Sequence, residues 1–497
     1  MVGVREQVTT PILIVGSGGN GIAVAALLDA AGYGDFMIIT KQADFGGAWF
    51  ENTYPGCEVD NPSAVYEFEF QRNFGWKALF AKQPELLAYF KDVASRYGLY
   101  ERTRFGVELL SARWSQADAS WIVATDQGSI TAGVLILATG FLEEAIVPEL
   151  PGKEDFPGPV FHSSKWPAEF TGAGMRVAVV GSGSSAIQIV PALQSIAEEV
   201  IQFQRTPTWV LPKNNRQLPP EEIALMQTSS SARERRQQES LAEEEQNWAA
   251  IFLALDEAKA DEYQQVARDY LMDSVADSDL QAALLPTHRI GCKRPLVSDD
   301  YYASLNQPNV LLVPQAVAGL TEQGVVAADG TQYAVDAVVL ATGFYFGGHI
   351  LHQVYRRDGL SVGAYQAGRP RAYKAISTAG CPNLFLVGGA APNGQIWNGL
   401  FPGQAAAQYI VGALDYMQAQ GITALEVTDE AERRWKAEAD ELLDQGPTVR
   451  GGCVNYSQDE AGRNKAAWPG SLASMREAYR VFAPADYVAV VGAPVPL

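Results

Sequence analysis

The chain has 497 residues, of which 47% are hydrophobic, and its 57 acidic and 37 basic side chains give a formal charge of −20. A chain of this length is too long for a single hydrophobic core, and its composition suits a globular protein of two or three domains. The composition therefore excludes intrinsic disorder as the default. The charge excludes general affinity for nucleic acids, because a phosphate backbone is repelled on average and any anionic ligand needs local donors.

The first predicted elements are a strand, a glycine-rich turn and a helix in direct succession. A short apolar run at 11–15 precedes the turn, and a run at 22–31 with helical periodicity follows it. The first glycine of a G-x-G-x-x-G turn permits the bend, the second lets the backbone approach a pyrophosphate, and the third lets the helix pack on the strand. Here these glycines are Gly16, Gly18 and Gly21.

The same order of elements returns in the second part of the chain. A strand is predicted at 176–180 and a helix at 187–193, and between them stand Gly181, Gly183, Ser184, Ser185 and Ala186. A buried strand that ends in Ala-Thr-Gly closes each half, at 134–140 and at 338–343. Two such halves predict two bound dinucleotides.

The second half contains an insertion, because its closing strand lies about 160 residues beyond its glycine-rich turn. The segment 219–285 fits this insertion, and its charged runs predict solvated helices that cover the domain without a role in chemistry. A further helix is predicted at 403–417.

The residues after the second strand of the second half indicate which nucleotide it binds. Arg205 and Thr206 follow the strand at 199–203, so a cation stands where an NAD-specific domain places a carboxylate. This favours a ribose 2′-phosphate and therefore NADP, while the alternative is a solvated surface arginine.

Other features concern compartment, metal and membrane. The longest apolar runs have strand length, far short of the roughly 20 residues of a spanning helix, and the first residues lack the regions of a signal peptide. We therefore expect a soluble, cytoplasmic protein. The four cysteines, Cys57, Cys292, Cys381 and Cys453, lie far apart without a C-x-x-C pair. We expect free thiols in packed surroundings and no metal site.

Two long sequence patterns carry a family resemblance. Between the two halves, Phe156, Gly158, His162, Trp166 and Pro167 form the run F-x-G-x-x-x-H-x-x-x-W-P. The segment from Gly47 through Trp49 to Asp60 matches G-x-W-x-x-x-x-[FY]-P-G-x-x-x-D in full. Together these patterns resemble the signatures of the Baeyer-Villiger monooxygenases, which are flavoenzymes that insert oxygen beside a ketone carbonyl.

The resemblance implies an α/β fold with two Rossmann-like domains, for FAD and for NADP, and a helical insertion in the second. The expected boundaries are 1–152 for the first part of the FAD domain, 153–170 for the linker, 171–345 for the NADP domain and 346–497 for the return to the FAD domain and the substrate pocket. The expected FAD contacts are Gly16, Gly18, Gly21, Thr40, Gly47, Trp49 and Asp60. The expected NADP contacts are Gly181, Gly183, Ser184, Ser185, Ala186, Arg205, Thr206 and Lys293.

The implied chemistry uses NADPH, dioxygen and a small ketone, and it gives an ester or lactone through a flavin peroxide. The segment Gly291-Cys-Lys293-Arg294 looks like the family segment with the essential arginine. An always-charged guanidinium suits the anionic oxygens of this reaction, and Asp60 is implied to orient Arg294 and balance its charge. Read without the resemblance, Asp60 is a turn acceptor and Arg294 a surface residue. His162 is expected to act through conformation or hydrogen bonding, and Trp49 and Trp166 through packing.

Several positions depart from the family pattern. Thr40 stands where FAD-binding relatives usually have Glu, Glu58 where Arg is frequent, and Asn455 where many have Trp. The family's usual Gly-Pro-Asn stretch is also replaced, by 388–394. The alternative functions are oxygenation of nitrogen or sulfur, which the terminal Trp166-Pro167 disfavours, and a non-catalytic flavin-binding regulator. A flavin-dependent dithiol reductase is disfavoured, because it needs paired cysteines and the sequence has no C-x-x-C pair. The particular ketone and the oligomeric state stay open.

Overall fold

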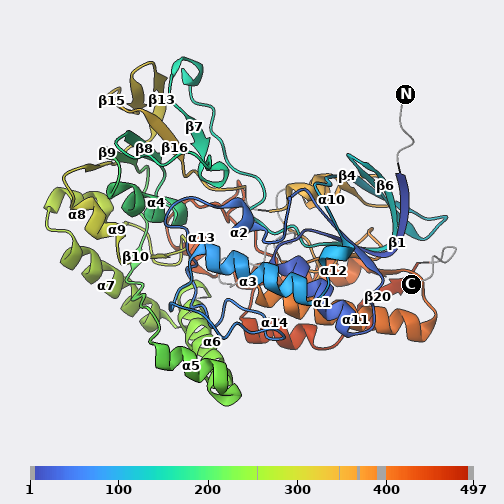
Figure 1. Ribbon diagram of the computed structural model, residues 1–497. Coiled ribbons are helices and arrows are strands. Elements are labelled where there is room, and N and C mark those ends of the chain that lie inside the picture. Colours follow the sequence, from blue (N-terminus) through green and yellow to red (C-terminus); the bar gives the residue numbers. More distant parts are fainter. Residues whose placement is uncertain (1–5, 254–255, 346, 367–369, 389–398, 491–497) are drawn as a thin grey trace.

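The computed structural model describes residues 6–253, 256–345, 347–366, 370–388 and 399–490. Two mainly parallel sheets dominate this part of the chain, and they lie in separate units (Figure 1). The first sheet has the order β17-β4-β5-β6-β1-β2-β3, and β18 also pairs with β6. Its strands are β1 Glu6–Val15, β2 Phe36–Thr40, β3 Thr103–Phe105, β4 Leu109–Ser115, β5 Ser120–Thr125, β6 Gly128–Leu137, β17 Val354–Tyr355 and β18 Leu384–Leu386.

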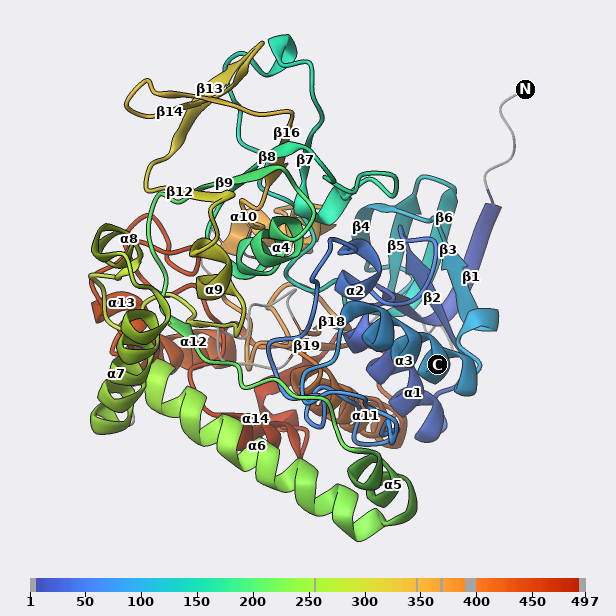
Figure 2. The ribbon, with the colours of Figure 1, turned by 60° about the vertical axis from the view of Figure 1, so that its left-hand side comes forward.

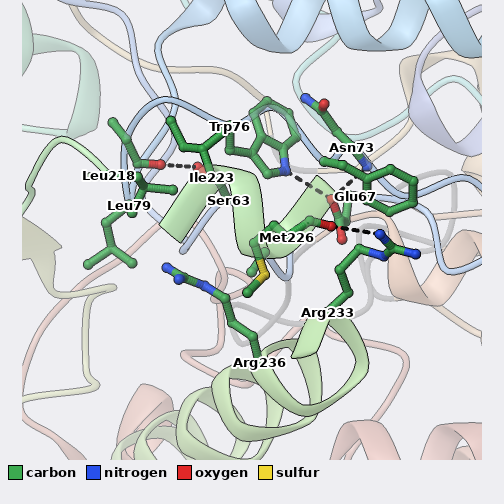
Figure 3. Close-up of a pocket in the computed structure, with 13 residues that line it drawn as sticks. Ser63, Glu67, Asn73, Trp76, Leu79, Leu218, Ile223, Met226, Arg233 and Arg236 are labelled. Atoms are coloured by element: carbon green, nitrogen blue, oxygen red, sulfur yellow. Dashed lines mark hydrogen bonds between the residues drawn. The ribbon is translucent and has the colours of Figure 1, made fainter. Parts of the chain in front are cut away.

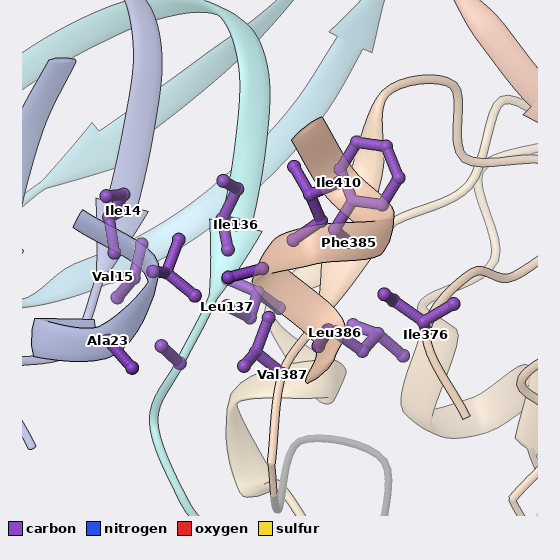
Figure 4. Close-up of a cluster of buried hydrophobic side chains, with 14 of the residues drawn as sticks. Ile14, Val15, Ala23, Ile136, Leu137, Ile376, Phe385, Leu386, Val387 and Ile410 are labelled. Carbon is purple, nitrogen blue, oxygen red and sulfur yellow. The ribbon is translucent and has the colours of Figure 1, made fainter. Parts of the chain in front are cut away.

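The largest hydrophobic core surrounds the centre of this first sheet. β1 runs parallel to β6 with Ile14 opposite Ile136, and β18 lies on the other side of β6 with Phe385 opposite Ile136. Figure 4 shows Phe385 beside Ile410 of helix α11, and Ile14 and Ile136 belong to the same buried cluster. Because the central strands are covered on both faces, they are apolar at almost every position and do not alternate.

The second sheet is smaller and has the order β12-β9-β8-β16-β7, with all its pairs parallel. Its strands are β7 Val160–His162, β8 Arg176–Val180, β9 Glu199–Phe203, β12 Val310–Val313 and β16 Ala337–Leu340. The remaining strands are β10 Val210–Leu211, β11 Leu296–Val297, β13 Val317–Thr321, β14 Gly324–Ala327, β15 Gln332–Ala334, β19 Leu425–Val427 and β20 Tyr487–Ala489.

Helices cover both sheets and form the insertion. Those beside the first sheet are α1 Gly19–Ala30, α2 Ala48–Glu51, α3 Gln83–Arg96, α10 Val362–Gln366, α11 Phe401–Gln420, α12 Asp429–Leu443 and α14 Leu472–Tyr479, while α13 Pro447–Arg450 lies against the insertion. Those of the second unit are α4 Ser184–Gln194, α5 Pro220–Thr228, α6 Ser230–Phe252, α7 Glu257–Ser274, α8 Ser278–Leu284 and α9 Tyr301–Leu305. Five short 3-10 helices complete the described elements, at Tyr100–Arg102, Lys153–Asp155, Ser163–Lys165, His349–His352 and Pro484–Asp486. No helix among the described residues is long and apolar enough to cross a membrane.

The insertion, α5 to α8, is attached to the first unit by backbone hydrogen bonds. Its long helix α6 extends from beside α7 to α5 in Figure 2. Leu79 N donates to Arg216 O at 2.9 Å and Leu218 N donates to Lys77 O at 2.8 Å, while Val59 N donates to Ala81 O at 3.0 Å. Three extended segments therefore lie side by side. The segment 216–218, which enters the insertion, bonds to the segment 77–81, and this middle segment bonds to Val59, just before Asp60.

A buried carboxyl group, Glu67, lies in the cavity between this attachment and α5 and α6 (Figure 3). Glu67 is 5% exposed and accepts hydrogen bonds from Trp76 Nε1 and Asn73 N, both at 2.9 Å. Burial raises the pKa of Glu67 to about 7, although these two donors lower it. The carboxyl group is therefore neutral in the folded protein at a pH where an unfolded chain has it ionised.

We expect Glu67 to make the stability pH-dependent. Because its folded pKa is raised, its contribution is fully present below the unfolded pKa near 4.5 and is lost as pH rises through about 7, by roughly 3 kcal/mol in total. Glu67→Gln should therefore gain in Tm over the wild type between pH 5.5 and 8.5. Differential scanning calorimetry across this range measures the gain. Exposed Glu221→Gln is the control, and a Tm difference that does not change with pH contradicts the prediction.

Candidate active site

The first glycine-rich turn connects β1 to α1 beside the end of β6. Gly16 has φ +117°, and a Cβ at this position would lie 2.4 Å from the carbonyl oxygen of Ala138. A Cβ at Gly21 would lie 2.0 Å from Gly16 O. Only glycine therefore permits the turn to lie against the closing strand and the helix to pack on the turn.

The same turn has polar atoms that suit a bound dinucleotide. Asn20 Oδ1 and Thr139 Oγ1 are buried and have no hydrogen-bond partner among the described residues. Buried polar atoms of this kind need a partner, so the turn fits a ligand with hydroxyl and phosphate groups, as FAD has. Thr40 is buried at the end of β2, and its Oγ1 accepts from Ser17 Oγ at 3.0 Å and Gln42 N at 3.2 Å. The contact between Thr40 and the ribose of FAD remains a prediction. The threonine hydroxyl can donate one hydrogen bond to the ribose.

The segment from Gly47 to Asp60 connects the first turn with the second unit. A Cβ at Gly47 would lie 2.6 Å from Gly18 Cα, so the two loops are in backbone contact. Trp49 Nε1 donates to Tyr66 Oη at 3.0 Å. Further along, Tyr54 Oη donates to Gln188 Oε1 of α4 at 3.1 Å, and Gln188 Nε2 donates to the carbonyl oxygen of Glu58 at 3.0 Å.

Asp60 and Arg294 form an ion pair across 234 positions of sequence. Arg294 Nη2 and Nε donate to Asp60 Oδ2 at 3.1 and 3.3 Å. The arginine side chain is 17% exposed and the aspartate side chain 33%. Trp248 of α6 lies beneath the guanidinium, with 5.0 Å between Arg294 Cζ and the centre of the indole ring. The structure thus holds a guanidinium between a carboxylate and an aromatic face, in partly desolvated surroundings.

The second glycine-rich turn connects β8 to α4. A Cβ at Gly183 would meet nothing within 4 Å, so this side of the turn is open to a ligand. Ser184 and Ser185 begin α4, Ala186 is buried beneath it, and Gly181 lies against the closing strand at Ala341. The backbone N–H groups at the start of α4 therefore face a position where a phosphate fits.

Two cations gather near this second turn. Burial lowers the pKa of the Lys293 ammonium, and the charge of Arg205 lowers it further. Burial and Lys293 lower the pKa of His288 to about 4, so this ring is neutral at ordinary pH. No carboxylate among the described residues forms an ion pair with Arg205 or Lys293. Uncompensated cations in a chain of charge −20 favour an anionic ligand. Thr206 follows Arg205, and its carbonyl oxygen accepts from Ser182 Oγ at 3.0 Å.

The central run from Phe156 to Pro167 lies at the edge of the second sheet as β7 and the turn after it. A Cβ at Gly158 would lie 2.1 Å from Asp336 O and 2.8 Å from the Phe156 ring, which explains the glycine. His162 is 3% exposed, and its Nε2 donates to Gly343 O at 3.0 Å while its Nδ1 accepts from Ser164 N at 3.2 Å. Burial lowers the pKa of His162 and keeps it neutral. His162 therefore connects the linker, where the chain enters the second unit, with Gly343, where the chain leaves it.

The aromatic end of this run packs within the linker. Trp166 Nε1 donates to Phe170 O at 2.9 Å, and its ring meets Phe161 edge to face at 5.2 Å. Pro167 precedes this contact and its carbonyl oxygen accepts from Phe170 N at 3.0 Å. The arrangement agrees with a packing role for Trp166.

Comparison with known proteins places this geometry in a family. The family model described as pyridine nucleotide-disulphide oxidoreductase matches residues 13–222. A Baeyer-Villiger monooxygenase of Streptomyces coelicolor is 34% identical over 487 residues, which cover 97% of this chain and 93% of the relative. The chain belongs to the Baeyer-Villiger monooxygenase family. A phenazine N-monooxygenase of Lysobacter antibioticus is also similar, with 28% identity over 90% of each chain.

Solved structures support this family and its fold of two Rossmann-like domains. A steroid monooxygenase bound to NADP has a TM-score of 0.85 and 26% identity, and the match covers 97% of this chain and 99% of that one. The complex of OTEMO with FAD and NADP has a TM-score of 0.84 and 25% identity, over 95% and 97% of the chains. A cyclohexanone-bound cyclohexanone monooxygenase has a TM-score of 0.82 and 28% identity, over the same shares.

The prediction of four free thiols is wrong for two of them. Cys292 and Cys453 form a disulfide, while Cys57 and Cys381 are free and buried. Spacing did not reveal this pair, because 161 positions separate the two cysteines and only the fold brings the segments together. No group of three metal-binding side chains occurs among the described residues.

The departures from the Baeyer-Villiger pattern have local explanations. Glu58 pairs with Lys213 Nζ at 2.5 Å, and this lysine side chain is 2% exposed. The charge of Glu58 is therefore neutralised from the second unit and not by Arg294. Asn455 turns inward, where its Nδ2 donates to Cys292 O at 2.9 Å. In the predicted unusual stretch 388–394, residues 389–394 lie outside the described part of the structure.

Trp248 was not predicted from the sequence, because it lies in an insertion with the charge pattern of solvated helices. A periodic apolar face was the available signal, since Trp248 and Phe252 are four residues apart and stack at 5.5 Å. Their position beneath Arg294 depends on how α6 packs, which periodicity alone does not determine.

We expect Trp248→Leu to lower oxygenation about fivefold while flavin reduction by NADPH changes little, because a cation–π contact contributes about 1 kcal/mol to holding a guanidinium. Trp248→Phe should lose less. Stopped-flow reduction rates and product yields measure the two steps. Tyr263→Leu removes the aromatic partner of Lys259, 5.3 Å away in the same insertion, and serves as the control. Equal losses in reduction and oxygenation contradict the prediction.

Proposed function

We propose that this chain is an FAD- and NADPH-dependent monooxygenase that inserts one oxygen atom of dioxygen beside the carbonyl of a small ketone, to give an ester or lactone. The observation that carries the proposal is the Asp60–Arg294 ion pair, which joins the family signature of the first unit to the arginine segment of the second. When bound, FAD supplies the activation of dioxygen, with electrons from NADPH.

The roles of the side chains follow from charge and position. A guanidinium stays protonated at any working pH, so Arg294 stabilises the anionic oxygen that develops when a ketone carbon is attacked. Asp60 orients the guanidinium by accepting from Nε and Nη2. Arg205 and Lys293 bind the ribose 2′-phosphate of NADPH, and the start of α4 binds its pyrophosphate. His162 acts by position, since its Nε2–H is engaged with Gly343 O.

A second candidate function is oxygenation of a nitrogen or sulfur centre. The similarity to the phenazine N-monooxygenase favours it. Soft nucleophiles attack oxygen directly and develop no oxyanion on carbon, so this reaction does not need Arg294 in the same way. The two candidates therefore differ in their dependence on one side chain.

The decisive experiment supplies purified protein with NADPH, oxygen and one substrate at a time. The substrates are a cyclic, a linear and an aryl ketone, a thioether and a phenazine, and the products are identified by mass. An ester or lactone from any ketone supports the proposal. Sulfoxide or N-oxide without an ester or lactone from any of the ketones overturns it and supports the second candidate.

A further inference from the structure

The disulfide between Cys292 and Cys453 lies beside the candidate catalytic arginine. Cys292 directly precedes Lys293 and Arg294, and Cys453 belongs to the segment 447–458 near the carboxyl end of the chain. A Cβ at Gly451 would lie 2.6 Å from Cys292 Cβ, so the two segments are packed at van der Waals distance here. The bridge therefore holds the turn that presents Arg294 against a segment far away in sequence.

Hydrogen bonds support the same contact on both sides of the bridge. Arg289 N donates to Gly451 O at 3.0 Å, and Cys453 N donates to Cys292 Sγ at 3.1 Å. Asn455 Nδ2 donates to Cys292 O at 2.9 Å and to Thr448 O at 3.2 Å. This set of contacts fixes the position of both segments more closely than a bridge alone would.

The bridged segment presents Tyr456 to the ion pair. Burial raises the pKa of the Tyr456 phenol, Arg294 lowers it, and Asp60 raises it again, so both charges act on this ring. The residue as a whole is 48% exposed, and Val454 beside it is 87% exposed. Residues 451–471, between α13 and α14, contain no helix or strand, so the position of Tyr456 depends on the contacts of the bridged segment.

We propose that the Cys292–Cys453 disulfide is a positioning bridge, which holds Arg294 and Tyr456 in the arrangement needed for oxygen transfer. Cys292 adjoins Lys293 of the predicted 2′-phosphate site as well as Arg294, so the effect of the bridge on oxygen transfer is measured at saturating NADPH. Its reduction by an external dithiol takes two electrons and two protons, gives two protein thiols and converts the reagent into its own disulfide. The inference rests on the proposed function, because oxygen transfer is the step that it affects.

Loss of the bridge should lower coupling, which is the ester formed per NADPH oxidised. In the double variant Cys292→Ser, Cys453→Ser, coupling should fall at least fivefold and hydrogen peroxide should rise by the matching amount, while the rate of flavin reduction stays within twofold. Dithiothreitol should produce the same loss in the wild type and no further loss in the double variant. Cys381→Ala, which removes a buried free thiol, should respond to dithiothreitol as the wild type does. Unchanged coupling without the bridge overturns the proposal.

Two measurements do not depend on oxygenation. Alkylation of the denatured, unreduced protein should label two cysteines, and four after reduction; four labelled before reduction overturns the proposal. Chymotrypsin should cut after Tyr456 more than fivefold faster in the reduced wild type and in the double variant than in the oxidised wild type. Asn455→Ala, which keeps the bridge, should show an intermediate rate. Equal cutting overturns the proposal even where no ketone is converted, whereas absence of an ester with protected Tyr456 contradicts only the proposed function.

Discussion

Arg294→Ala is expected to lower ester or lactone formation by about 10² to 10³-fold, because loss of one preorganised donor to a developing oxyanion costs about 3 to 4 kcal/mol. The flavin should still be reduced by NADPH, since the predicted nucleotide contacts lie at Arg205 and α4. Electrons then leave as hydrogen peroxide, so NADPH oxidation continues without product. Stopped-flow reduction rates, peroxide assays and product masses separate these steps.

Two further variants make this prediction specific. Arg294→Lys keeps a positive charge but loses the two donors, Nε and Nη2, that bond Asp60. Most of the activity should therefore still be lost. Arg289→Ala removes an arginine of the same turn that pairs with Asp261, and it should keep near wild-type activity. Normal ester formation by Arg294→Ala removes this residue from the mechanism.

Arg205→Ala is expected to raise KM for NADPH about tenfold or more and to leave KM for NADH nearly unchanged. A hydrogen bond to a charged group contributes roughly 1.5 to 3 kcal/mol, and only NADPH carries the 2′-phosphate that would use it. The remaining Lys293 limits the loss. Steady-state kinetics with both coenzymes, at fixed ionic strength, measures the change.

The control for coenzyme choice is Arg235→Ala, which removes an exposed arginine from α6 and should alter neither KM. Arg205→Ala should also bind 2′-AMP more weakly than the wild type in a competition assay, while its affinity for AMP stays the same. Parallel changes for both coenzymes contradict the assignment of the 2′-phosphate to Arg205.

The fold class was predictable because its signals are local. Each glycine-rich turn occupies six successive positions between an apolar run and a helix, and the contacts at Gly16 and Gly181 show why no other residue fits there. The predicted helix at 403–417 is part of α11, and α5 to α8 occupy the predicted insertion. Short segments of this kind determine their own backbone conformation, so one chain read alone reveals them.

Contacts among residues distant in sequence could not be predicted in this way. The cysteine spacing pointed to free thiols, yet two of the four are bonded, because a disulfide depends on where two segments meet and not on how far apart they are in sequence. Trp248 was hidden for a similar reason: a helix with charges on most positions still has one side against Arg294.

The sequence by itself determined the two nucleotide-binding halves, the linker run and the identity of Asp60 and Arg294 as candidates, since each belongs to a continuous pattern. Only the tertiary structure decided that these two side chains lie 3.1 Å apart, that Lys213 neutralises Glu58, and that Trp248 and the Cys292–Cys453 bridge surround the arginine. The physical reason is that local backbone geometry depends on neighbouring residues, whereas these contacts depend on the packing of the sheets, the insertion and the carboxyl-terminal segment together.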